Sequence, residues 1–122
     1  MQHSQRFLDL VNDTKSGIRE STVDQVKQDT ASGAEFVLVD TREESEWAAG
    51  HAAGALHLGK GIIERDIEGA VPDTSKKIVL YCGGGYRSAL AADALQKMGY
   101  SNVYSLAGGW RAWNEAAMPV ER

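Results

Sequence analysis

The sequence is poor in residues that build disulfides, metal sites and rigid turns. Its 122 residues include one cysteine, two prolines and three histidines. A single cysteine cannot form an internal disulfide bond, so nothing in the chain calls for an oxidising compartment. The histidines have no cysteine or carboxylate partners at the spacing of metal ligands, so we expect no metal and no organic cofactor.

Long apolar runs are also absent. No stretch approaches the roughly 20 apolar residues of a membrane-spanning helix, and no signal-peptide pattern follows the first residues. We therefore expect a cytoplasmic protein that does not bind membranes. The formal net charge of −4 argues against a broad nucleic-acid-binding surface. The length predicts a single main folded unit.

Short hydrophobic segments alternate with helical patterns along the chain. Strands are predicted at 35–40, 55–58, 77–82 and 102–106, with a short extended piece from Ile18. Helices are predicted at 5–13, 22–33, 43–48, 61–68 and 87–98, and around Trp110 and Trp113. This alternation predicts an α/β fold with a parallel sheet covered on both faces. In such folds, ligands bind beyond the carboxyl ends of the strands.

The segment 77–88 carries the clearest chemistry. Four hydrophobic residues precede Cys82, three glycines follow it, and four residues separate it from Arg87. A strand, a glycine-rich turn and a helix start present backbone N–H groups that attract anions. A thiolate at this place would be stabilised as the anion, its reactive form. Arg87 adds a planar cation that suits oxyanions.

A lone cysteine is more often a small buried hydrophobic residue than a nucleophile. A flexible glycine turn, however, does not require Cys82 at one end and Arg87 at the other. A lower thiol pKa raises the thiolate fraction but lowers the nucleophilicity of each thiolate, so the rate of attack gains little. The same change makes the sulfur a better leaving group. The loop therefore suits a sulfur that both attacks and departs, as in persulfide transfer. Its four intervening residues suit one anionic sulfur, whereas cysteine phosphatases use a longer loop around phosphate.

Three segments together carry a family resemblance. They are residues 40–58, with Asp-Thr-Arg-Glu at the start, residues 81–88, and residues 108–113, which read Gly-Gly-Trp-Arg-Ala-Trp. In this order they resemble the rhodanese sulfurtransferases in their single-domain form. The resemblance implies a three-layer sandwich with a five-stranded parallel sheet flanked by helices on both faces. It places the domain at 18–122, after an N-terminal helical extension at 1–17 to which no function is assigned.

The resemblance implies a thiosulfate sulfurtransferase. Such an enzyme moves sulfane sulfur from a small anionic donor, thiosulfate or a related compound, to cyanide or a thiol acceptor. Cys82 would be the catalytic residue and would carry the sulfur as a persulfide. The residues implied to bind the persulfide are Gly83, Gly84, Gly85, Tyr86, Arg87 and Ser88. The neutral glycines differ from the basic loop of well-known thiosulfate enzymes, so the donor stays open, as does the acceptor.

Two other functions stay open on the same fold. One is a non-catalytic binding module, although inactive members of the family usually lack the cysteine that this chain retains. The other is a cysteine phosphatase or arsenate reductase, against which the short loop argues.

Asp40 and Arg42 lie at a predicted strand end near the ligand edge of the sheet. They can line the pocket, or they can form a local ion pair that holds the turn into the next helix. The tryptophans Trp47, Trp110 and Trp113 are expected to pack in the core or over the site.

Four more side chains receive weaker predictions. Glu46 and His51 are expected to lock the loop between them, and Lys60 and Arg65 to face the pocket and attract anions. His3 carries no signal in the sequence.

Overall fold

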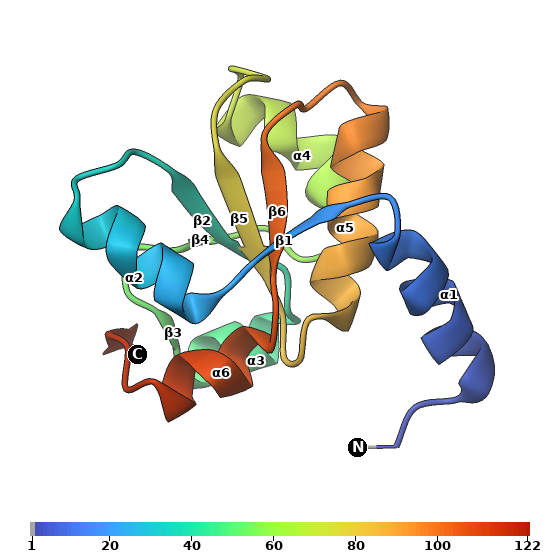
Figure 1. Cartoon of the computed structure of the whole chain (residues 1–122), viewed down its shortest axis with the longest axis horizontal. Coiled ribbons are helices and arrows are strands. Elements are labelled where there is room, and N and C mark those ends of the chain that lie inside the picture. The colour runs from blue at the N-terminus through green and yellow to red at the C-terminus, as the bar shows by residue number, and fades with distance from the viewer. Residues whose placement is uncertain (1) are drawn as a thin grey trace.

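The computed structural model describes residues 2–122 and contains a central parallel sheet (Figure 1). The five strands lie in the order β1-β6-β5-β2-β4 and all neighbours are parallel. Their bounds are β1 Arg19–Ser21, β2 Val37–Asp40, β4 Leu56–His57, β5 Ile78–Tyr81 and β6 Val103–Leu106. The predicted α/β fold with a five-stranded parallel sheet is confirmed.

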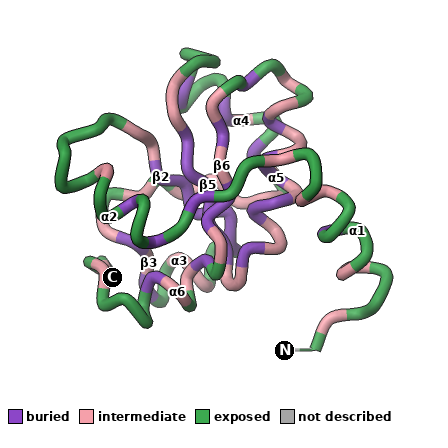
Figure 2. Tube along the Cα trace, viewed as in Figure 1, coloured by how far each residue is buried: buried purple, intermediate pink, exposed green. Residues whose placement is uncertain are grey.

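Within residues 2–122, six helices surround the sheet. They are α1 Gln5–Lys15, α2 Val23–Ala31, α3 Glu44–Ala49, α4 Ile63–Ala70, α5 Tyr86–Lys97 and α6 Gly109–Glu115. Successive side chains of a strand point to opposite faces, so Ile78 and Leu80 pack with α4 and α5. Val79 and Tyr81 instead pack with α2 and α6. Two hydrophobic cores therefore enclose the sheet, which is the predicted three-layer arrangement. Figure 2 shows buried residues along the central strands β2, β5 and β6.

Two short strands were not predicted. β3 (His51–Ala52) and β7 (Val120–Glu121) pair antiparallel, so the C-terminal end of the chain lies beside the segment after α3. Strands of two residues have no repeating hydrophobic pattern, and only the partner strand defines them. The other elements agree with the sequence prediction apart from shifts at their ends.

The N-terminal helix α1 packs against α5 (Figure 1). Its Val11 is buried, and Gln96 of α5 donates a hydrogen bond to the carbonyl of Gly17 at 3.0 Å. The extension predicted at 1–17 is thus joined to the domain by both apolar and polar contacts. No helix within residues 2–122 has the length and apolar character needed to cross a membrane.

Candidate active site

Cys82 follows the last residue of β5 and precedes α5, at the carboxyl edge of the sheet. The residue is buried, with 1% of its surface exposed, yet it borders a pocket of about 780 Å³. The N–H of Gly85 donates to the Cys82 Sγ at 3.2 Å, and the Ser88 hydroxyl lies 3.6 Å from the same sulfur. Both donors favour a negatively charged sulfur at the start of a helix.

The backbone of the loop is held by α6. The N–H of Trp110 donates to the carbonyl of Cys82 at 2.7 Å, and that of Arg111 to the carbonyl of Gly83 at 3.2 Å. In a trans peptide the C=O and N–H groups point in opposite directions, so the N–H groups of Gly83 and Gly84 point away from α6. The motif at 108–113 therefore orients the loop that follows β5.

Two glycines are required for this geometry. Gly85 has a φ of 97°, which is left-handed and favours glycine. Gly109 also has a positive φ, of 50°, and a Cβ on it would collide with the carbonyl of Cys82. These positions explain why glycines stand both after the cysteine and before the tryptophan.

Arg87 is held by Glu46 of α3. The guanidinium donates from Nη1 to Oε1 at 2.7 Å and from Nη2 to Oε2 at 3.1 Å. This pair raises the pKa of Arg87, with a smaller contribution from neighbouring Cys82, and lowers the pKa of Glu46. The prediction that Glu46 and His51 lock the loop between them holds for His51, whose Nδ1 lies 3.1 Å from the carbonyl of Trp47. Glu46 binds Arg87 instead.

Ser88 lies beneath the sulfur and is fully buried. Its hydroxyl is 2.8 Å from the hydroxyl of Ser105 in β6, which is also buried. A hydroxyl has one proton to donate, so Ser105 can donate to Ser88 while Ser88 donates to Cys82. Sequence reasoning missed Ser105 because nothing near it in the chain indicates the site.

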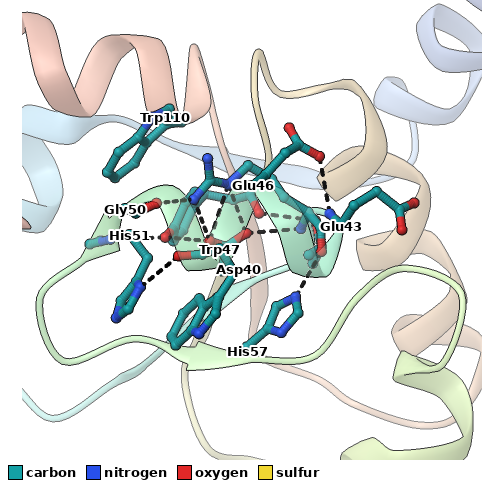
Figure 3. A network of polar contacts seen from close by, with 12 residues as sticks. Asp40, Glu43, Glu46, Trp47, Gly50, His51, His57 and Trp110 are labelled. Atoms are coloured by element: carbon teal, nitrogen blue, oxygen red, sulfur yellow. Dashed lines mark hydrogen bonds and ion pairs between the residues drawn. The ribbon is translucent and has the colours of Figure 1, made fainter. Parts of the chain in front are cut away.

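Asp40 and Arg42 form a buried ion pair rather than a pocket wall. Arg42 Nη2 lies 2.8 Å from Asp40 Oδ2, and the hydroxyl of Tyr81 donates to the same oxygen at 2.8 Å. Burial is the main cause of the raised pKa of Tyr81. Arg42 also donates to the carbonyl of Gly50 at 2.6 Å, and Trp110 lies near this network (Figure 3). The pocket-lining interpretation is therefore corrected to the ion-pair interpretation, because neither Asp40 nor Arg42 borders the cavity beside Cys82.

The other predicted cations and the tryptophans do not form the wall of the pocket. Lys60 and Arg65 do not border the pocket, and Arg65 pairs with Asp66 at the surface. Trp47 stacks on His51 with 3.4 Å between ring centroids (Figure 3). Trp113 is buried in the core and Trp110 is packed against it, as expected for the tryptophans.

The rest of the pocket wall comes from residues that sequence reasoning did not place in the pocket. They are Gln2, His3, Ser4 and Phe7 from the N-terminal segment, Glu43 and Glu46 beside α3, and Arg111 of α6. Arg111 lies in the motif at 108–113, so the sequence held a signal that could have indicated it. The N-terminal residues carry no local signal, because only the packing of α1 on α5 brings them to the cysteine.

Comparison with known proteins gives the family. The rhodanese-like domain family matches residues 22–116. The thiosulfate sulfurtransferase GlpE of Pseudomonas putida is 40% identical over 85 residues, which cover 70% of this chain and 74% of that protein. The probable adenylyltransferase/sulfurtransferase MoeZ of Mycobacterium tuberculosis is 36% identical over 88 residues, covering 72% of this chain but only 22% of MoeZ.

A solved structure from Rhodopseudomonas palustris covers 99% of this chain and 98% of its own, at 32% identity and a TM-score of 0.87. That protein has no known function and is described as a possible tyrosine phosphatase. The family match spans most of the present chain, and the named relatives that share its sequence are sulfurtransferases. The chain therefore belongs to the rhodanese-like domain family.

Proposed function

We propose that this chain is a sulfurtransferase that carries sulfane sulfur on Cys82. The observation that supports this most directly is the Gly85 N–H aimed at the Cys82 sulfur, beside an open pocket. The 40% identity to GlpE, a named thiosulfate sulfurtransferase, supports the same activity. Donor and acceptor are part of the proposal: thiosulfate or a related donor, and cyanide or a thiol.

The proposed cycle has two displacements. The Cys82 thiolate attacks the outer sulfur of thiosulfate, the sulfur–sulfur bond of the donor breaks, and sulfite leaves with the bonding electron pair. The product on the protein is a persulfide anion. Cyanide or a thiolate then attacks the outer sulfur, so that thiocyanate or a new persulfide leaves and the Cys82 thiolate returns.

The loop has a role in both steps. The persulfide places its negative charge one atom further into the pocket than the thiolate does. We propose that the N–H groups of Gly83 to Ser88 bind this outer sulfur, because preorganised donors stabilise developing charge without reorganising. Arg87, held by Glu46, adds a positive charge beside it.

Intact-protein mass spectrometry tests the proposal. Thiosulfate should add one sulfur atom to the wild-type protein, and cyanide should remove it with formation of thiocyanate. Cys82→Ser should gain no sulfur. A wild-type protein that takes up no sulfur from thiosulfate or any organic sulfane donor would overturn the proposal and favour a binding module.

A phosphatase is the competing catalytic function, because the R. palustris protein is described as a possible tyrosine phosphatase. The four residues between Cys82 and Arg87 argue against a cradle for tetrahedral phosphate. Hydrolysis of p-nitrophenyl phosphate faster than thiocyanate formation, and lost in Cys82→Ser, would reverse the order of the two functions.

A further inference from the structure

The pocket beside Cys82 has an aromatic wall. His3, Phe7 and Tyr86 form a cluster in which the Tyr86 ring centroid lies 4.9 Å from that of His3 and 6.1 Å from that of Phe7. Both contacts are edge-to-face, and the His3 and Phe7 rings are 5.2 Å apart. All three residues border the cavity that Cys82 also borders.

Two of these rings come from outside the family match. His3 and Phe7 belong to the N-terminal segment, whereas the rhodanese-like match begins at residue 22. The solved R. palustris structure covers 99% of this chain, so it extends over this segment as well. The aromatic wall is therefore an addition to the matched domain that reaches its reactive cysteine.

The charges around the pocket cancel. Two guanidinium groups, of Arg87 and Arg111, and two carboxylates, of Glu43 and Glu46, border it. Glu46 already pairs with Arg87. Arg111 is exposed and has no ion pair among residues 2–122. Besides that pair, the pocket is bordered by one cation, Arg111, and one carboxylate, Glu43, so a doubly charged anion finds no excess of positive charge.

We propose, resting on the sulfurtransferase function above, that the preferred donor is an organic sulfane compound with one negative charge and an apolar body. In a thiosulfonate the terminal sulfur and the sulfonyl oxygens share the single charge. The terminal sulfur reaches Cys82, the sulfonyl oxygens lie beside Arg111, and the apolar body packs on His3, Phe7 and Tyr86. Thiosulfate carries two charges and no apolar body, so it uses only part of this pocket.

The transfer step balances for such a donor. With benzenethiosulfonate as the probe, the Cys82 thiolate bonds to the terminal sulfur, and the bond from that sulfur to the sulfonyl group breaks. Benzenesulfinate leaves with the electron pair, and the protein carries the same persulfide that thiosulfate would form. No oxidant or reductant is needed, because the transferred sulfur keeps its oxidation state.

Steady-state kinetics with cyanide as the common acceptor test the preference. In a double displacement, kcat/KM for the donor reports the donor half-reaction alone. The wild-type value for benzenethiosulfonate should exceed that for thiosulfate at least about tenfold, as expected for burial of an aromatic group. Methanethiosulfonate, with the same charge and a smaller body, should fall between them.

Substitutions locate the cause. Two variants are tested: Phe7→Ala in α1 and His3→Ala ahead of that helix. Each should lower kcat/KM for benzenethiosulfonate several-fold and change kcat/KM for thiosulfate less than about twofold. Leu10→Ala is the control, because Leu10 lies on the same helix, is 53% exposed and does not border the pocket. It should leave both values unchanged.

The results separate this inference from the function on which it rests. If neither donor forms a persulfide on Cys82, the sulfurtransferase proposal itself fails. If both donors form it with equal kcat/KM, or if Phe7→Ala and His3→Ala lower both values equally, only the assignment of an organic donor is overturned.

Discussion

Glu46 holds the guanidinium of Arg87 with two hydrogen bonds, at 2.7 and 3.1 Å, across 41 residues of sequence. The two residues come from different helices, since Glu46 lies in the first turn of α3 and Arg87 in the first turn of α5. The cation beside Cys82 is therefore positioned by a carboxylate from another part of the sheet edge.

Removing that carboxylate should weaken sulfur transfer. In Glu46→Ala, Arg87 loses its two acceptors and its fixed place, so we expect kcat/KM for thiosulfate to fall about tenfold. The free energy of unfolding should change by less than about 1 kcal/mol, because the pair is partly exposed. Glu46→Gln, which keeps one acceptor, should recover part of the rate. Thiocyanate formation and urea unfolding measure the two effects.

The matched control is Glu44→Ala, an exposed carboxylate in the same turn of α3 that does not border the pocket. Its kcat/KM should equal that of the wild type. Equal losses in both variants would mean that general charge around α3, and not the position of Arg87, sets the rate.

The hydroxyl of Ser88 should raise the reactivity of Cys82. Ser88→Ala removes the donor 3.6 Å from the sulfur, and we expect alkylation by iodoacetamide at neutral pH and persulfide formation to slow several-fold. Ser105→Ala leaves Ser88 free to donate to the sulfur and should slow them less. If Ser105→Ala slowed both reactions more than Ser88→Ala, the assigned direction of donation would be wrong.

The close approach of α6 to the loop predicts a large effect at Gly109. Gly109→Ala places a Cβ against the carbonyl of Cys82 at a φ of 50°, so we expect a loss of about 2 to 4 kcal/mol in the free energy of unfolding. Gly69→Ala is the control, since Gly69 lies in α4 with nothing within 4 Å of an added Cβ. It should be neutral or stabilising by up to about 1 kcal/mol in the same urea titration.

The buried pair of Asp40 and Arg42 should matter for stability. Asp40→Ala leaves the buried Arg42, a residue that is 3% exposed, without its carboxylate, at a cost of about 3 to 5 kcal/mol. The rate of sulfur transfer per folded molecule should stay near that of the wild type, because neither residue borders the pocket. Asp66→Asn, at an exposed pair, should change stability by less than about 1 kcal/mol. Full stability with lost activity in Asp40→Ala would restore the pocket-lining interpretation.

Acid should weaken the hold of Glu46 on Arg87. The pKa of Glu46 in the folded protein lies below its ordinary value of 4.5, chiefly because of Arg87. The stability that this shift contributes is present above pH 4.5 and is lost as the pH falls through the lower folded value. Urea unfolding over this range should show a smaller loss on acidification in Glu46→Gln than in the wild type. An equal loss in both proteins would show that other carboxylates account for it.

The loop from Cys82 to Ser88 was predictable because its chemistry lies in consecutive residues. A hydrophobic strand, three glycines and an arginine define a turn whatever the rest of the chain does, and the alternation of strands and helices predicts the parallel sheet. The ion pair of Asp40 and Arg42 was also visible as an alternative, since the two residues are neighbours in sequence. Only the burial of both side chains decided between the two interpretations.

Residues distant in the chain could not be placed in this way. Four side chains reach the loop because α3, β6, α1 and α6 converge on one edge of the sheet; they are Glu46, Ser105, Phe7 and Arg111. His3 carries no local sequence pattern at all. Hydrophobic periodicity and turn chemistry act over a few residues, so the sequence alone determines the strand, the turn and the position of the thiol between them. Packing between elements acts through space, so the tertiary structure alone decides which distant side chains hold Arg87, support the sulfur and form the wall of the pocket.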